Sequence, residues 1–325
     1  MPHRSFSNTG LALGLLSAAT FGTSGSFASS LIAAGWTPGA AVTARVAIAA
    51  AVLTLPALVQ LRSHRVTARA ARSAVLYGVV AVAGAQLCYF NAVEHLSVAV
   101  ALLLEYSGIL LVIAWMWARH GHRPRRLTLA GGGVALIGLV FVLDLVGSHN
   151  LDLAGVLWGL GAAVGLAVYF VVSSNADGAL PPLVIAWGGL AVGAVALGCA
   201  GVSGALPLHA TRADVTLLHT KVSWVVPVLG LAIVAAVIAY VAGIGAARLL
   251  GAKVASFVGL TEVLFAVTFA WLLLGQRLDV AQGVGGLLVI GGITLVRLDE
   301  MRATAPAHPA APPEQRVLAA DRIAG

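Results

Sequence analysis

Three ionisable residues lie deep inside long apolar stretches of this chain. Glu105 and Glu262 each stand alone among aliphatic residues, and Arg45 interrupts a stretch rich in alanine and valine. Carboxylates can hold an ammonium group or exchange a proton, and a guanidinium can hold a carboxylate through two parallel hydrogen bonds. Together the three residues suit a zwitterionic solute such as an amino acid.

A structural role is the alternative interpretation of the same residues. Arg45 and Glu105 could form a buried ion pair that fixes helix packing, while Glu262 is protonated and hydrogen-bonded. Other polar and aromatic residues at similar depth could line a cavity, although helix packing would explain each of them too. These candidates are Tyr89, Asn91, Tyr106, Tyr240 and Thr261, together with Gln86, Trp158, Tyr169 and Trp187.

The composition indicates which elements must position these residues. Apolar residues make up 60% of the 325 residues and charged residues 10%, whereas soluble domains have about 45–50% and about 25%. Such a chain cannot cover a globule with polar surface, which excludes a soluble enzyme, and its hydrophobicity excludes a disordered protein. In a membrane protein, a charge at the bilayer centre costs about 2.5–3.5 kcal/mol, so the three ionisable residues are expected to have a function.

Ten apolar segments are each about 20 residues long, the length that an α-helix needs to cross a bilayer. They are 11–33, 39–61, 74–93, 97–118, 127–146, 153–174, 182–202, 224–247, 252–274 and 279–297. If the N-terminus is inside, 15 of the 19 lysine and arginine residues fall in cytoplasmic segments and three fall outside. This bias predicts that both termini are cytoplasmic. It also explains the net charge of +7, so nucleic acid is not expected as a partner.

Two parts of the chain are similar to each other. Each has a tyrosine, then a lone glutamate, a tryptophan nine or ten residues later, and a glycine-rich segment. Because five spans are an odd number, two such halves must insert with opposite orientation. We therefore expect an all-α integral membrane protein of ten transmembrane helices in two inverted five-helix repeats, 11–146 and 147–298. Residues 1–10 precede them, and the proline-rich tail 299–325 is expected to be cytoplasmic and disordered.

Three motifs resemble the EamA-type drug/metabolite transporter superfamily, in which two five-helix EamA repeats form a ten-helix bundle. They are LLLEYSGILLV around Glu105, RPRR at 123–126, and LTEVLFAVTFAWLLLGQRLDVAQGVGG from residue 260. The first is most similar to the threonine/homoserine exporter branch, where an aromatic residue and then Gly-Pro follow the glutamate. Ile109 stands where that proline would be, Val263 replaces a proline after the second glutamate, and Gln276 replaces a glutamate common in the family.

The resemblance implies a multi-pass secondary transporter that exports small metabolites, such as amino acids or related compounds, across the bacterial cytoplasmic membrane by alternating access. It implies a small-molecule substrate and no cofactor, and it allows a homodimer through the glycine-rich spans 127–146 and 279–297. Two alternatives stay open: efflux of lipophilic cations or drugs, and an intramembrane enzyme acting on a lipid-linked substrate. The sequence has no phosphate-binding loop, and His120 and His122 lack acidic or thiol partners for a metal.

Overall fold

The computed structural model describes residues 8–64, 66–95, 98–120, 125–142, 152–174, 180–218, 220–274 and 280–304, which are mostly helical. The predicted tail beyond residue 304, residues 1–7, His122 and Gln276 lie outside these ranges. The elements are α1 (Asn8–Ala33), α2 (Pro38–Leu61), α3 (Ala68–Leu76), η1 (Tyr77–Gly84), α4 (Ala85–His95), α5 (Val98–Tyr106), α6 (Gly108–His120), α7 (Arg126–Val142), α8 (Leu153–Ser174), α9 (Pro182–Val202), β1 (Val215–Leu217), β2 (Thr220–Val222), α10 (Val225–Leu229), η2 (Gly230–Ile238), α11 (Ala239–Gly259), α12 (Thr261–Leu274) and α13 (Val280–Thr304).

Within the described ranges, six helical stretches are long and apolar enough to cross a membrane. They are Asn8–Ala33, Pro38–Leu61, Ala71–Tyr89, Leu153–Ser174, Pro182–Val202 and Val225–Gly259. Shorter apolar helices cover Arg126–Phe141, Thr261–Leu273 and Gly283–Val296. These helices support a multi-pass membrane protein, and the number of ten crossings stays a prediction.

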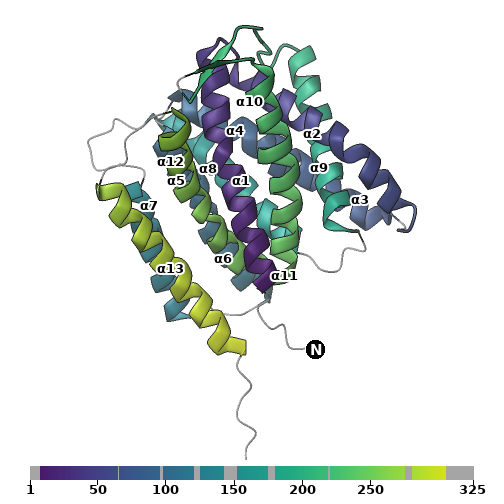
Figure 1. The fold of residues 1–325 in the computed structure, drawn as a ribbon. Helices are drawn as coiled ribbons and strands as arrows, with labels where there is room; N and C mark the ends of the chain where they lie inside the picture. Colours follow the sequence, from purple (N-terminus) through teal and green to yellow (C-terminus); the bar gives the residue numbers. More distant parts are fainter. Residues whose placement is uncertain are drawn as a thin grey trace, which may run out of the picture.

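Two helices of the bundle, α7 and α13, pack along each other at one side (Figure 1). A Cβ atom added to Gly131 would lie 2.8 Å from the carbonyl oxygen of Gly292, and one added to Gly138 would lie 2.7 Å from that of Gly285. Glycine permits this close approach of two backbones inside a membrane. These glycines make contacts within one chain, and the homodimer expected from the same segments stays a prediction.

Two π-helices lie in the bundle: η1 connects α3 to α4, and η2 connects α10 to α11. The turns of a π-helix are wider than those of an α-helix, and such segments often occur at functional sites. A Cβ atom on Gly78 would lie 2.7 Å from the carbonyl oxygen of Gly189, so η1 lies directly against the backbone of α9. Each π-helix belongs to the third predicted span of its half.

The connection between α9 and α10 forms a cap over one end of the bundle, with the antiparallel hairpin of β1 and β2 in it (Figure 1). Trp36 Nε1 donates to the carbonyl oxygen of Thr211 at 2.9 Å. The backbone N–H of Leu218 donates to the carbonyl oxygen of Leu273, near the end of α12, at 3.0 Å. The cap therefore joins the ends of α1 and α12, while α1 begins and α13 ends at the opposite end of the bundle (Figure 1).

Candidate functional site

Both mid-span glutamates stand beside an interruption in a helix. α5 ends at Tyr106, one residue after Glu105, and α6 begins at Gly108. α11 ends at Gly259, and α12 begins one residue before Glu262. The sequence placed both glutamates in continuous helices, and the structure corrects this expectation. Each carboxylate therefore lies beside a one-residue break between two helices.

Close packing at a glycine accompanies each interruption. A Cβ atom on Gly108 would lie 2.4 Å from a backbone carbonyl oxygen of α8, and one on Gly259 would lie 2.8 Å from an aromatic ring of the same helix. The hydroxyl groups of Ser107 and Thr261 each donate to the carbonyl oxygen three residues earlier. Such local bonds compete with regular helical hydrogen bonding. The two halves of the chain thus interrupt their helices by similar means.

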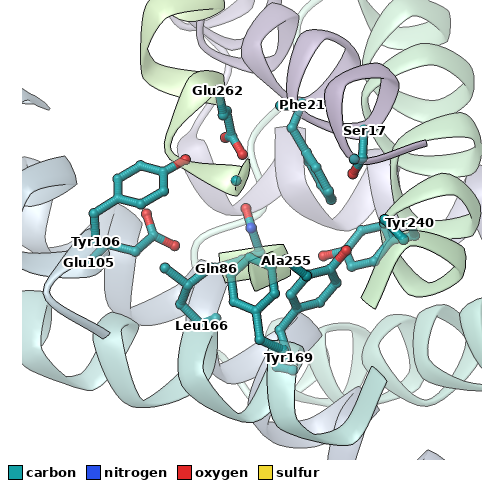
Figure 2. Close-up of a pocket in the computed structure, with 18 residues that line it drawn as sticks. Ser17, Phe21, Gln86, Glu105, Tyr106, Leu166, Tyr169, Tyr240, Ala255 and Glu262 are labelled. Atoms are coloured by element: carbon teal, nitrogen blue, oxygen red, sulfur yellow. The ribbon is translucent and has the colours of Figure 1, made fainter. Parts of the chain in front are cut away.

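The two glutamates line one cavity between α1, η1, α4, α5, α8, α11 and α12 (Figure 2). The centres of water-sized molecules can occupy about 80 Å³ of it. A single water needs about 10–15 Å³ by the same measure, so the cavity has room for several waters or a small solute. α1 lies directly against the second interruption, since a Cβ atom on Gly22 would lie 3.1 Å from the carbonyl oxygen of Glu262.

The two carboxylates have different surroundings, although both side chains are half-buried. The hydroxyl of Tyr106 points toward the Glu262 carboxylate (Figure 2). The Glu105 carboxylate has no hydrogen-bond partner within the part of the chain that the structure describes. Glu105 is therefore free to accept a hydrogen bond from a solute in the cavity.

Arg45 lies behind the cavity surface and is buried. Its Nη2 atom donates to the carbonyl oxygen of Ala235, in η2, at 2.6 Å. Its Nη1 atom donates to Ser24 Oγ at 3.0 Å and lies 3.5 Å from Gln86 Oε1. The guanidinium carbon lies 5.7 Å from the centroid of the Phe21 ring. These contacts hold α2 against α1, α4 and η2.

The ion pair that was the alternative expectation for Arg45 is not formed. Among the residues that the structure describes, no salt bridge joins Arg45 to Glu105 or Glu262. The groups that accept from the guanidinium are instead a hydroxyl oxygen and a backbone carbonyl oxygen. Neither glutamate is needed to neutralise Arg45 through direct contact, and both carboxylates face the cavity.

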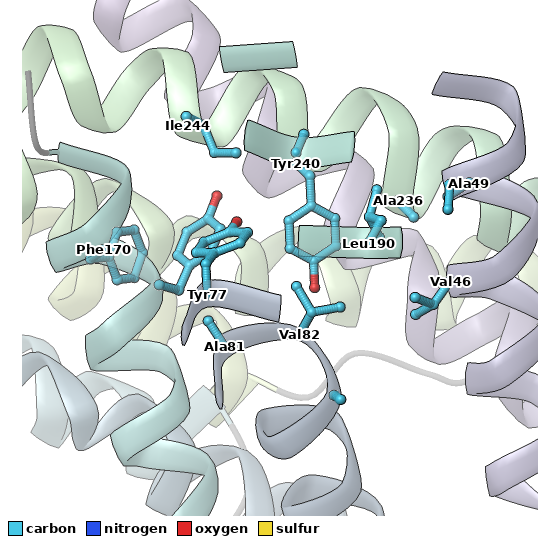
Figure 3. Packing of buried hydrophobic residues seen from close by; sticks show 14 of the residues in the cluster. Val46, Ala49, Tyr77, Ala81, Val82, Phe170, Leu190, Ala236, Tyr240 and Ile244 are labelled. Atoms are coloured by element: carbon cyan, nitrogen blue, oxygen red, sulfur yellow. The ribbon is translucent and has the colours of Figure 1, made fainter. Parts of the chain in front are cut away.

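Aromatic rings close one side of the cavity. The ring centroid of Tyr240 lies 5.0 Å from that of Phe21 and 6.0 Å from that of Tyr169. Tyr77 packs behind them, 5.9 Å from Tyr169 between ring centroids, where it meets the aliphatic core (Figure 3). This wall gives the cavity an apolar side opposite the carboxylates.

The structure divides the residues expected to line a cavity. Tyr106, Tyr169 and Tyr240 line it together with the two glutamates, and Gln86 lines it as well. Tyr89, Asn91 and Thr261 are not among the lining residues. The amide of Asn91 donates to a backbone carbonyl of its own helix, and Thr261 does the same through its hydroxyl. Both side chains thus satisfy local backbone groups.

Some lining residues carry no signal in the sequence. Ser17 and Phe21 on α1 face the cavity, yet this helix contains no ionisable residue. Ser17 Oγ donates to the carbonyl oxygen of Ala239 at 2.8 Å, which ties α1 to α11. The glycines of α1 are the nearest signal, because they predict close packing of this helix against its neighbours.

The profile of the EamA-like transporter family matches residues 8–144 and again residues 153–298. An uncharacterised inner membrane transporter of Salmonella typhimurium, YicL, is 26% identical over 238 residues, which are 71% of this chain and 75% of that protein. A solved structure superposes with a TM-score of 0.72 at 20% identity, covering 89% of this chain and 97% of the other, and shows similarity of fold alone.

Proposed function

Because the chain belongs to the EamA-like transporter family, we propose that it is a secondary transporter. It exports small metabolites that bear an amino group across the bacterial cytoplasmic membrane by alternating access. The observation that carries this proposal is the meeting of Glu105 and Glu262 in one cavity of solute size. Each comes from a different one of the two stretches that the family profile matches. Carboxylates in an aromatic cavity attract ammonium groups.

The two matched stretches support an arrangement as two inverted repeats, 11–146 and 147–298. Each stretch contains one π-helix and, in the next predicted span, one interrupted helix with a glutamate beside the interruption. Discontinuous helices at the interface of two repeats are typical of transporter binding sites. The inner membrane location of the Salmonella relative and the positive charges of the loops support a cytoplasmic membrane protein with both termini inside.

Amino acids are the first substrates to test, since the motif around Glu105 is similar to the threonine/homoserine exporter branch. Efflux of lipophilic cations is the second candidate, and one observation favours it. Glu105 and Glu262 line the cavity and Arg45 does not. The cavity lining therefore has carboxylates but no guanidinium group. A solute with no carboxylate would therefore find a matching site.

Counterflow in proteoliposomes tests the proposal. Vesicles loaded with unlabelled solute receive the labelled solute outside, and the probes are leucine, 3-methylbutylamine, 4-methylpentanoate and tetraphenylphosphonium. We expect exchange of leucine and of the amine, which share an ammonium group, and none of the carboxylate alone. Exchange of tetraphenylphosphonium in place of leucine would support the second candidate. Exchange of 4-methylpentanoate without either amine would contradict both.

A further inference from the structure

The amide of Gln86 lies between the buried guanidinium of Arg45 and the cavity. Gln86 Oε1 is 3.5 Å from Arg45 Nη1, and the side chain lines the cavity (Figure 2). An arginine offers only donors, so the amide oxygen is the group that must face it. The amide nitrogen, with its two N–H donors, is then turned away from Arg45.

The Nε2 atom of Gln86 is available to a solute. Within the described part of the chain, no protein group accepts a hydrogen bond from this nitrogen. The nitrogen is also not completely buried. An atom that has no protein acceptor and is not sealed in the interior is open to the cavity. The amide therefore presents donors in a cavity whose carboxylates are acceptors.

Arg45 keeps the amide in this orientation. The guanidinium is 4% exposed and is held by Ser24 Oγ and by the carbonyl oxygen of Ala235. A fixed positive charge next to the amide oxygen polarises the amide and strengthens its N–H groups as donors. Arg45 is thus a positioning residue, which acts on the solute through Gln86 and not by contact.

We propose that Gln86 determines specificity by donating a hydrogen bond to a carbonyl or carboxylate oxygen of the solute. This proposal rests on the proposed transport of amines, in which the glutamates hold the ammonium group of the solute. The site then prefers solutes that carry an ammonium group and an oxygen acceptor together, such as amino acids and their amides or esters. A simple amine of the same shape binds through its ammonium group alone and gains nothing from Gln86.

The test compares leucine with 3-methylbutylamine, which lacks only the carboxylate, in binding to the purified full-length protein. Gln86→Glu keeps an acceptor for Arg45 but removes the N–H donors. We expect the ratio of the amine Kd to the leucine Kd to fall about tenfold or more, because hydrogen bonds to charged groups are among the stronger ones. Gln86→Met, which has similar length and no charge, should lower the same ratio.

Two controls separate specificity from structure. Gln60→Glu makes the same change in α2 at a residue outside the cavity lining, and the ratio should stay within twofold of the wild-type value. Arg45→Leu should lower the ratio while the amine still binds, since the amide loses its fixed orientation. An unchanged ratio in both Gln86 variants overturns this inference alone. A wild-type protein that binds neither probe overturns the proposed function and the inference with it.

Discussion

Replacing Glu105 with glutamine tests the site most directly, because the Glu105 carboxylate has no partner among the described residues. Glutamine keeps the length of the side chain and can still accept a hydrogen bond, but it carries no charge. A hydrogen bond to a charged group contributes about 1.5–3 kcal/mol. At about 1.4 kcal/mol per tenfold change, Glu105→Gln should weaken the binding of leucine or 3-methylbutylamine by roughly 10- to 100-fold.

Thermal unfolding in detergent gives the second half of this prediction. If Glu105 neutralised Arg45, its replacement would leave a buried charge unpaired, which typically costs about 3–5 kcal/mol. The guanidinium is instead held by Ser24 and the carbonyl of Ala235, so the Tm of Glu105→Gln should stay near that of the wild-type protein. The binding loss is then attributable to the cavity.

The result that refutes this reasoning has two forms. A Kd within twofold of the wild-type value would mean that Glu105 does not hold the ammonium group. A large fall in Tm, restored by adding Arg45→Gln, would mean that the two residues do neutralise each other. Isothermal titration gives the Kd and thermal unfolding gives the Tm of each variant, so the two outcomes are distinguished.

The remaining predictions concern the second carboxylate, the packing and the topology. Glu262→Gln should abolish counterflow but not membrane insertion, because glutamine carries no charge with which to hold the ammonium group; wild-type flux from a folded variant would contradict this role. Gly108→Ala should lower the free energy of unfolding by about 1–3 kcal/mol, as overpacking does, because the new Cβ would lie 2.4 Å from a carbonyl oxygen of α8. Gly133→Ala is the control: a Cβ atom there has nothing within 4 Å, so this variant should be as stable as the wild-type protein. After replacement of the native cysteines, an impermeant thiol reagent on intact cells should label Ser203→Cys and not Ser63→Cys, and the opposite pattern would reverse the proposed orientation.

The positions of the two glutamates in the sequence predicted much of the candidate site. A lone carboxylate in an apolar segment is costly, so its presence indicates a function whatever the fold. Glu105 and Glu262 do meet in one cavity. The helix interruptions beside them could not be predicted, since Ser107 and Gly259 are residues that continuous membrane helices also contain. Beside both interruptions a glycine packs against α8, which is a tertiary contact.

The surroundings of Arg45 show the limit of reasoning from charge alone. Opposite charges at similar depth suggested an ion pair with Glu105, yet a hydroxyl and a backbone carbonyl hold the guanidinium. That carbonyl belongs to Ala235, and nothing in an alanine side chain marks its backbone oxygen as an acceptor. Which carbonyls are left for side chains depends on the local helix type, and the π-helices were not visible in the hydrophobic pattern.

The two π-helices have a consequence for how related chains are compared. One residue added to an α-helix turns everything after it by about 100° around the helix axis, and a π-helix absorbs such an insertion locally. A homologue one residue shorter within 77–84 or 230–238 would therefore have its gap at that point, with the flanking helical faces preserved. Placing the gap in a neighbouring loop would assign the position of Tyr240 to the wrong face of its helix, so the length of these two short segments decides which residues are equivalent.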